Sequence, residues 1–441
     1  MKSKIITRYY PDGEIQKAQI VTFDSWKSLD FIQPVFNRKA FDQLCDIYQY
    51  FMVDAYPFIF GKMVLFYLPE GYKTTGKVDK NKYGNISDEL TRAAIILSEG
   101  VTIQNNEPYF KTLDGELLWR DLESKGCLKT AYGRRSKTRF IPVSNKTGFL
   151  SQMEPDAAMK VNSSFFIMDF IDTATVFDHV GEAFGLMVDE GKIISPPMFD
   201  REALLVREEG IRIQKVGIGD VGISINGRKF FGEIYSRPKY KVTPPGNKDI
   251  IIVGNKVVCV RNNGRTVIPA GGYAVKVGKS SRIKPGDEVN YSGFEDVIFG
   301  IQVGNSLVID GKKTEEFISP FYNIRRLGST SFPPSLYPLR YDKDRAPRIA
   351  LGADKDNKPI LIWAEGAGKF GHVKGEESCG ATLKEMSDIC LEAGMYNGIN
   401  LDGGGSAQIL LQNQRYLKIS DRIRENNEEN ERAVPFGLMV K

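Results

Sequence analysis

Histidine and cysteine are scarce in this chain of 441 residues. Only two histidines, His179 and His372, are present, so a metal site built from several histidines is excluded. The five cysteines are odd in number, and no two of them form a CxxC pair. This spacing indicates neither a disulfide framework nor a zinc site. We therefore expect no cofactor and assign no metal ligand. Whether a divalent cation binds is left open.

Long apolar runs are also missing. The most apolar stretch, residues 58–68, is short and contains Lys62, so it fits a buried strand and not a membrane span. The first eight residues lack the apolar core of a signal peptide. As written, the sequence predicts a soluble cytoplasmic protein without a membrane span, or a secreted one if a leader was removed.

A strong charge of one sign is absent as well. The formal net charge is +5, and the basic residues are spread along the chain without clustering. This distribution gives no reason to expect binding to a nucleic acid duplex. It is compatible with a small-molecule or glycan substrate that carries negative charge. The oligomeric state is left open.

Length and composition predict more than one domain. A chain of 441 residues exceeds what one compact core usually holds. Its 43 glycines favour a turn-rich and strand-rich architecture over a helical bundle. We expect an α+β fold, with a smaller α/β N-terminal domain over residues 1–130 and a mixed β-sheet-rich domain over residues 131–441.

The N-terminal region is predicted to be partly helical. Aromatic and apolar residues recur at roughly helical spacing over residues 25–48, which predicts one or two amphipathic helices. Residues 85–97 are a further helix candidate, with Ser87 as its cap. Residues 73–83 are charged and contain glycine, so they predict an exposed loop. No catalytic constellation is found in this region, and its role stays open.

From about residue 130, short β-rich runs alternate with turn signals. Asn262-Asn263-Gly264 predicts a hairpin turn, and Lys284-Pro285-Gly286-Asp287 predicts a tight turn. The expected strands are residues 138–143, 158–166, 250–260, 272–277, 348–351 and 359–364.

The last hundred residues contain the clearest local pattern. Thr382 and Glu385 have the spacing of a capping box, so a helix is expected to begin there and to stop at Gly394. A short strand at residues 399–401 then brings Asp402 to its end. Functional groups often lie where a rigid element ends and a loop begins.

The loop Asp402-Gly403-Gly404-Gly405-Ser406 is the sharpest signal in the sequence. Three consecutive glycines cost backbone entropy, so a fold keeps them where unusual dihedral angles or close approach are needed. Their N–H groups can form a concave anion site, beside which Asp402 places a carboxylate and Ser406 a hydroxyl. On spacing alone, a flexible turn between two strands fits equally well.

This loop, with Asn400 and Leu401 before it, resembles the signature of the phosphodiester glycosidase family. The resemblance covers about residues 130–441, and it implies a hydrolase that cleaves the C1–O bond of a sugar-1-phosphodiester to release free sugar and a phosphomonoester. Further segments resemble the family in the same order along the chain: residues 158–166, 268–273, 284–289, 304–308, 347–352, 380–385 and 431–434.

One of these segments departs from the family. Ser163 and Ser164 replace two glycines that usually follow the asparagine at position 162. Serine would be strained in a loop that needs positive φ. The departure therefore bears on the local backbone and the sugar pocket more than on the chemistry.

Roles for the catalytic residues follow from the bond that breaks. The leaving group is a phosphate monoester, already a weak base, so stabilising its charge should matter more than protonating it. Arg348 is the first candidate for this contact, since a guanidinium can engage phosphate through two hydrogen bonds, and Arg432 is the second. Asp402 and Glu365 are the candidate nucleophile or general base, Glu365 because it ends a predicted strand.

The remaining candidates would bind substrate. Asn162 and Asn400 would hold sugar hydroxyls or the phosphate, or else brace a turn. Thr382 is expected to cap a helix whose N-terminus adds an anion site. His372 lies in a glycine-rich loop that would close over the substrate. The set of expected substrate-binding residues is completed by Gly403, Gly404, Gly405, Ser406 and Arg432.

Two other classes of function stay open. A metal-dependent phosphodiesterase would use acidic residues such as Asp169, Asp172 and Asp402, but the chain has too few histidines for a typical two-metal cluster. A non-catalytic module that binds carbohydrate or an anion is the second. The presence of Asp402, Glu365 and Arg348 together favours the enzyme.

Overall fold

A computed structural model describes residues 1–35, 146–167, 181–197, 200–237, 239–315, 344–368, 372–423 and 425–441, single residues between these ranges, and three short strands between residues 103 and 118. The strands expected at 58–68 and 138–143, the helix expected at 85–97 and the loop expected at 73–83 lie outside the described residues. Within the described part, no helix is long and apolar enough to cross a membrane.

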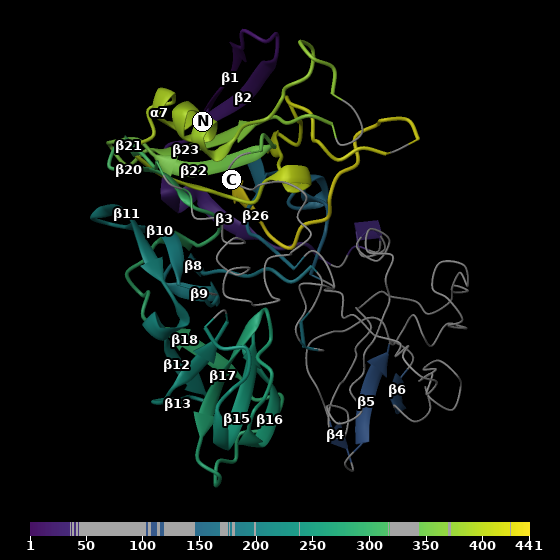
Figure 1. Ribbon diagram of the computed structural model, residues 1–441, viewed down its shortest axis with the longest axis vertical. Coiled ribbons are helices and arrows are strands. Elements are labelled where there is room, and N and C mark those ends of the chain that lie inside the picture. The colour runs from purple at the N-terminus through teal and green to yellow at the C-terminus, as the bar shows by residue number, and fades with distance from the viewer. Residues whose placement is uncertain are drawn as a thin grey trace.

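A seven-stranded antiparallel sheet organises the fold (Figure 1). Its strands follow the order β1 (Lys2–Tyr9), β2 (Ile15–Thr22), β23 (Pro359–Ala364), β22 (Arg348–Ala353), β24 (Asn397–Asn400), β20 (Ser306–Ile309) and β21 (Lys312–Lys313). Every neighbouring pair is antiparallel. This central sheet therefore joins residues 2–22 to residues 306–400.

Both faces of the central sheet are covered. Every residue of β22 and β23 is buried. Since alternate residues of a strand point to opposite faces, Ala350 and Ile362 pack on the side of helix α7 (Leu383–Glu392), whereas Leu351 and Trp363 pack on the other side. The two strands consequently have no polar face.

Two further sheets pack against the face opposite α7. The apolar residues of all three sheets share one core, in which Trp26 stacks on Phe299 at a centroid distance of 5.6 Å. One sheet has the order β25 (Ile409–Leu411), β7 (Met159–Asn162), β26 (Gly437–Val440) and β3 (Leu29–Ile32). The other has the order β11 (Gly210–Val216), β10 (Arg201–Arg207), β19 (Phe299–Ile301), β8 (Met187–Asp189) and β9 (Lys192–Ser195).

Two smaller sheets lie at the end of the molecule remote from α7, with β8 to β11 between them and the central sheet (Figure 1). Isoleucine and valine side chains from both form a common core. One sheet contains β13 (Arg228–Lys229), β12 (Gly222–Ile225) and β18 (Val289–Ser292). The other contains β14 (Ile234–Ser236), β17 (Gly272–Val277), β15 (Pro245–Val253) and β16 (Lys256–Gly264).

The remaining described elements are short. One more sheet contains β4 (Ile103–Gln104), β5 (Glu107–Thr112) and β6 (Gly115–Leu118). The 3-10 helices are η1 (Trp26–Ser28), η2 (Leu150–Gln152), η4 (Ile218–Asp220) and η5 (Gly404–Ser406).

The sheet-rich character expected from the sequence is confirmed, and β17 and β23 have the predicted bounds. The capping box of α7 is also present: the Thr382 hydroxyl accepts from the Glu385 N–H at 3.1 Å, and the Glu385 carboxylate accepts from the Thr382 N–H at 2.9 Å. Gly394 follows the helix with a φ of 84°. Since α7 is the one α-helix whose bounds the described residues define, the α+β label stays a prediction.

One local prediction is right only in part, and another is wrong. Within the region 25–48, expected to form one or two helices, residues 26–32 form η1 and β3, because pairing of β3 with β26 overrides the local periodicity. Farther along this region, Lys39, Ala40 and Gln43 are helical. The hairpin turn expected at residues 262–264 lies instead at Gly254 and Asn255, between β15 and β16. Gly254 adopts a φ of 57°, which suits a two-residue hairpin turn.

Residues 1–32 belong to the same sheets as the C-terminal part of the chain. β2 pairs with β23, and β3 pairs with β26. The domain boundary predicted near residue 130 lies outside the described residues and stays a prediction.

Candidate active site

Antiparallel pairing brings three candidate residues to one end of the central sheet. β23 and β24 run toward this end, and β22, which lies between them, begins there. Glu365 directly follows β23, Arg348 begins β22, and Asp402 follows β24 by two residues. Adjacent strands lie about 4.8 Å apart, so the backbones of Glu365 and Asp402 are separated by about two such spacings.

The main chain of Asp402 is held on both sides. Its N–H donates to the Ser163 carbonyl at 3.0 Å, and its carbonyl accepts from Nδ2 of Asn162 at 2.8 Å. Oδ1 of Asn162 accepts from the Gln408 N–H at 3.0 Å. Both polar ends of the Asn162 side chain therefore fix the loop around Asp402, so this asparagine acts as a brace.

The side chain of Asp402 is buried, with 6% of the residue exposed. Burial raises the pKa of Asp402 from 3.8 to about 7, against the lowering influence of the Ser406 hydroxyl, the Arg432 guanidinium and the Gly403 N–H. Among the described residues, Oδ2 of this carboxyl finds no hydrogen-bond partner. A carboxyl that titrates near neutral pH and keeps a free oxygen is suited to proton transfer or nucleophilic attack.

Two serines beside Asp402 have further unpaired polar atoms. Ser163 and Ser164 are buried, and neither hydroxyl has a partner in the part of the chain that the structure describes. Neither residue has a positive φ, so serine is accommodated here without strain. Buried polar groups are usually hydrogen-bonded, so unpaired hydroxyls on a segment whose main chain binds that of Asp402 mark a place where a polar ligand would bind.

Close packing explains two of the three glycines, and backbone conformation explains the third. A Cβ atom on Gly403 would lie 2.6 Å from the Pro347 carbonyl oxygen, and one on Gly405 would lie 2.3 Å from Nη2 of Arg432. Gly404 has a φ of 60°, which favours glycine. Its N–H donates to the Pro347 carbonyl at 2.9 Å, so this N–H is already occupied within the protein.

Arg432 is the cation that acts on Asp402. Its Nη2 and Nε lie 2.7 and 2.8 Å from Oδ2 of Asp421, and both side chains of this ion pair are largely buried. The positive charge of Arg432 lowers the pKa of the Asp402 carboxyl. A guanidinium next to this carboxyl can bind a phosphate oxygen.

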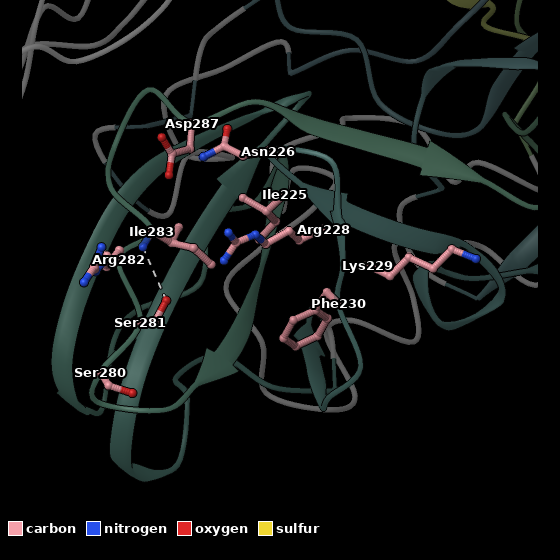
Figure 2. Close-up of a pocket in the computed structure, with 10 residues that line it drawn as sticks. All are labelled: Ile225, Asn226, Arg228, Lys229, Phe230, Ser280, Ser281, Arg282, Ile283 and Asp287. Atoms are coloured by element: carbon pink, nitrogen blue, oxygen red, sulfur yellow. Dashed lines mark hydrogen bonds between the residues drawn. The ribbon is translucent and has the colours of Figure 1, made fainter.

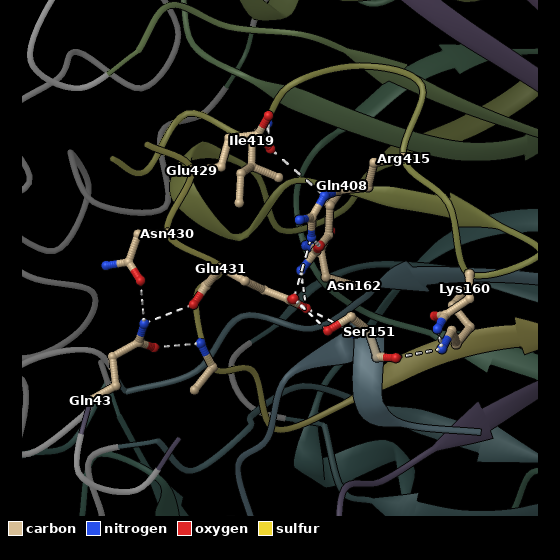
Figure 3. A network of polar contacts seen from close by, with 12 residues as sticks. Gln43, Ser151, Lys160, Asn162, Gln408, Arg415, Ile419, Glu429, Asn430 and Glu431 are labelled. Carbon is tan, nitrogen blue, oxygen red and sulfur yellow. Dashed lines mark hydrogen bonds and ion pairs between the residues drawn. The ribbon is translucent and has the colours of Figure 1, made fainter. Parts of the chain in front are cut away.

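A polar network fixes the chain on both sides of Arg432 (Figure 3). The Glu431 carboxylate accepts from the N–H and hydroxyl of Ser151 at 2.9 and 2.6 Å, and from Nε2 of Gln408 at 3.2 Å. Gln43 donates to the Glu431 carbonyl at 2.7 Å and accepts from the N–H of residue 433 at 2.8 Å. Because the main chain of Gln408 also contacts the asparagine brace, the network connects Arg432 with the loop of the buried carboxyl.

Glu365 is a second buried carboxyl at this end of the sheet, with 5% of the residue exposed. Its Oε1 accepts from the Lys418 N–H at 2.7 Å. Burial raises the pKa of Glu365, and the Lys418 N–H together with the charges of Lys17, Lys418 and Arg422 opposes that rise. The site therefore contains two carboxyls whose pKa values are both raised by burial.

Arg348 and Thr382 make contacts within the fold. Nε and Nη2 of Arg348 donate to the carbonyls of Ala381 and Asp344, each at 3.1 Å, and the residue is buried. Thr382 caps α7. The Arg348 guanidinium thus ties the start of β22 to the segment that leads into the helix.

Asn400 and His372 lie in different surroundings. Asn400 is buried and donates from Nδ2 to the Leu401 carbonyl at 2.7 Å. Nε2 of His372 lies 2.7 Å from Oε2 of Glu14, in the hairpin between β1 and β2. The structure therefore connects His372 to this hairpin.

Asp421 and Gln43 are not among the residues predicted from the sequence. Asp421 holds the guanidinium of Arg432, and Gln43 holds the main chain beside it. A largely buried arginine such as Arg432 needs a nearby anion. An acidic residue close to Arg432 in the sequence was therefore the available signal for Asp421. Gln43 has no such signal, since its partners lie almost the whole chain away.

A metal-binding set is not found in the described residues, where no three histidine, cysteine, aspartate or glutamate side chains gather in a suitable group. Asp169 and Asp172, considered for a metal-dependent reaction, lie outside the described residues.

Comparison with known proteins gives a family match over half of the chain. The family model described as phosphodiester glycosidase matches residues 220–441. No curated protein matches the chain significantly.

Two solved structures resemble this chain at low sequence identity. A hypothetical protein from Synechocystis is 18% identical with a TM-score of 0.38, and the match covers 68% of this chain and 54% of that one, about half its length. The catalytic domain of zebrafish N-acetylglucosamine-1-phosphodiester alpha-N-acetylglucosaminidase, auto-inhibited by its pro-peptide, is 11% identical with a TM-score of 0.39. That match covers 100% of this chain and 82% of the zebrafish chain.

Proposed function

The chain belongs to the phosphodiester glycosidase family, and from this premise we propose that it hydrolyses the C1–O bond of a sugar-1-phosphodiester. The products are free sugar and a phosphomonoester. The observation that carries this proposal is the buried carboxyl of Asp402, whose pKa is about 7 and whose Oδ2 has no hydrogen-bond partner among the described residues, beside Arg432.

The proposed reaction assigns the bond-breaking work to Asp402 and Arg432. The oxygen of a water molecule forms the new bond to C1, either directly or after a carboxylate has attacked C1, and the C1–O bond breaks. The bonding electron pair leaves with the phosphate oxygen. Asp402 acts as the base or nucleophile in its ionised form, and Arg432 stabilises the negative charge on the departing phosphate.

Glu365 is proposed as the second carboxyl of the reaction. Glycoside hydrolysis commonly uses two carboxyls on opposite sides of the reacting carbon. Glu365 follows β23, which lies two strands from β24, the strand that precedes Asp402, and burial raises the pKa of Glu365. Glu365 would accept or return the proton that Asp402 does not transfer.

The other candidates are proposed to position these groups and the substrate. Arg348 is assigned to the start of β22, where it holds the segment before α7. Asn162 holds the loop of Asp402. The free hydroxyls of Ser163 and Ser164 are assigned to sugar hydroxyls.

The decisive experiment is turnover in water labelled with ¹⁸O, using a panel of sugar-1-phosphodiesters and nucleotide sugars, with the products weighed by mass spectrometry. Label in the free sugar supports cleavage at C1. Label in the phosphate would mean attack on phosphorus, the reaction of a phosphodiesterase, and would overturn the proposal.

A variant pair separates catalysis from mere binding. Asp402→Asn is expected to abolish turnover, whereas Asp356→Asn, at an exposed turn position, is expected to retain it. Substrate binding by calorimetry without turnover in the unmodified chain would instead identify a non-catalytic module.

A further inference from the structure

A cleft of about 600 Å³ lies among β12, β13 and the loop at residues 280–287. This part of the molecule is at the end remote from α7 and the central sheet, with β8 to β11 in between (Figure 1). The cleft is therefore separate from the site around Asp402. Its size is that of a typical small-ligand pocket.

Two arginines with no partner border the cleft. Arg228 and Arg282 are both exposed, and neither side chain has an ion pair or hydrogen bond within the described structure. The carboxylate of Asp287 also lines the cleft, but it is buried and accepts the Lys284 N–H at 2.9 Å, within its own tight turn. The two arginines outnumber this one carboxylate, so the wall carries a net positive charge.

An aromatic ring and hydroxyls accompany these cations. Figure 2 shows the side chains of Arg228 and Phe230 near the other lining residues, while the side chain of Lys229, which also lines the cleft, extends away from them. Ser281 accepts from the Ile283 N–H at 3.3 Å, so its own hydroxyl proton is available to a ligand.

The loop that contains the serines is anchored. Nζ of Lys248, which projects from β15, donates to the Ser281 carbonyl at 2.7 Å, and the Ser281 N–H donates to the Gly278 carbonyl at 3.0 Å. The opposite wall is fixed where Asn226 accepts from the Glu288 N–H at 3.2 Å. Both walls are thus held in place before any ligand arrives, which limits the ordering cost of binding.

We propose that this cleft is a second binding site, for a phosphorylated saccharide. The guanidinium groups of Arg228 and Arg282 would hold the phosphate by charge-assisted hydrogen bonds. The ring of Phe230 would cover an apolar face of the sugar, and the hydroxyls of Ser280 and Ser281 would meet sugar hydroxyls. This binding requires no turnover, so it stands apart from the proposed hydrolysis.

Binding to the full chain by titration calorimetry tests the proposal with three probes: glucose 6-phosphate, glucose and inorganic phosphate. Glucose 6-phosphate is expected to bind more tightly than glucose or inorganic phosphate. Loss of two charged hydrogen-bonding groups in R228Q/R282Q is expected to weaken it at least about tenfold. The matched control R212Q/K215Q changes two exposed cations on β11 and should leave the affinity unchanged.

Two further measurements locate the site and keep the test decisive. Hydrogen–deuterium exchange with glucose 6-phosphate should show protection at residues 222–230 and 278–288, and R432Q, which alters the site at Asp402, should retain that protection. F230L should weaken binding of glucose 6-phosphate but not of inorganic phosphate. The proposal would be overturned if glucose 6-phosphate and inorganic phosphate bound equally well both to the unmodified chain and to F230L. It would also be overturned if R212Q/K215Q lost as much affinity as R228Q/R282Q, or if residues 222–230 and 278–288 showed no protection.

Discussion

Replacement of Asp402 by asparagine should make the folded chain more stable at alkaline pH. The Asp402 carboxyl has a pKa of about 7 in the fold, compared with 3.8 when unperturbed. Below about pH 4 it is protonated in both the folded and unfolded chain. As pH rises toward 7 the unfolded chain releases this proton first, so stability falls by up to about 1.4 kcal/mol per pH unit. Above pH 7 the loss is complete, at about 4 kcal/mol.

The asparagine variant has no such proton to lose. We therefore expect Asp402→Asn to raise the free energy of unfolding by about 2 to 4 kcal/mol at pH 8, but by only about 1 kcal/mol at pH 4.5. Urea unfolding can be followed by tryptophan fluorescence, because Trp26 and Trp363 lie in the core beside the central sheet. Asp356→Asn, in an exposed turn, should change stability by less than about 0.5 kcal/mol at either pH. An equal gain for Asp402→Asn at both pH values, or none at pH 8, would refute the assignment of a raised pKa.

Three other outcomes are expected. The value of kcat/KM should increase with pH through an apparent pKa of about 7, since the ionised Asp402 is the active form; a flat profile between pH 5 and 8 would contradict this role. Arg432→Gln should lower kcat by about 10² to 10³-fold, as loss of a transition-state donor does. Steady-state assays of the variant and the wild type measure this loss, and a smaller loss would contradict the role of Arg432 in stabilising the phosphate. Thr382→Ala should lower the free energy of unfolding by about 1 kcal/mol through loss of the α7 cap, with kcat unchanged; a large fall in kcat would instead give Thr382 a role in substrate binding.

Local features of the fold could be predicted from sequence. The capping box of α7 depends on two residues three positions apart, and the strand β23 is a short apolar run bounded by turn residues. The loop that follows β24 was identified by its three glycines. These features are determined by neighbours in the chain, so a local pattern is sufficient to reveal them.

Contacts between distant segments could not be predicted in the same way. The main chain of Asp402 is held by Asn162 and Ser163, which lie more than 200 positions earlier in the chain. The carbonyl partners of Arg348 likewise come from segments outside its own strand. Periodicity near residue 25 favoured a helix, but the partner that makes β3 a strand lies near residue 440.

The pairing of β3 with β26 affects how the protein is made. Residues 29–32 are synthesised long before residues 437–440, with which they pair. Such a high contact order slows folding and leaves apolar strand surface uncovered during translation. Until residues 437–440 are present, β3 has no partner strand from β26, so incomplete chains are expected to aggregate more readily than chains that contain both strands.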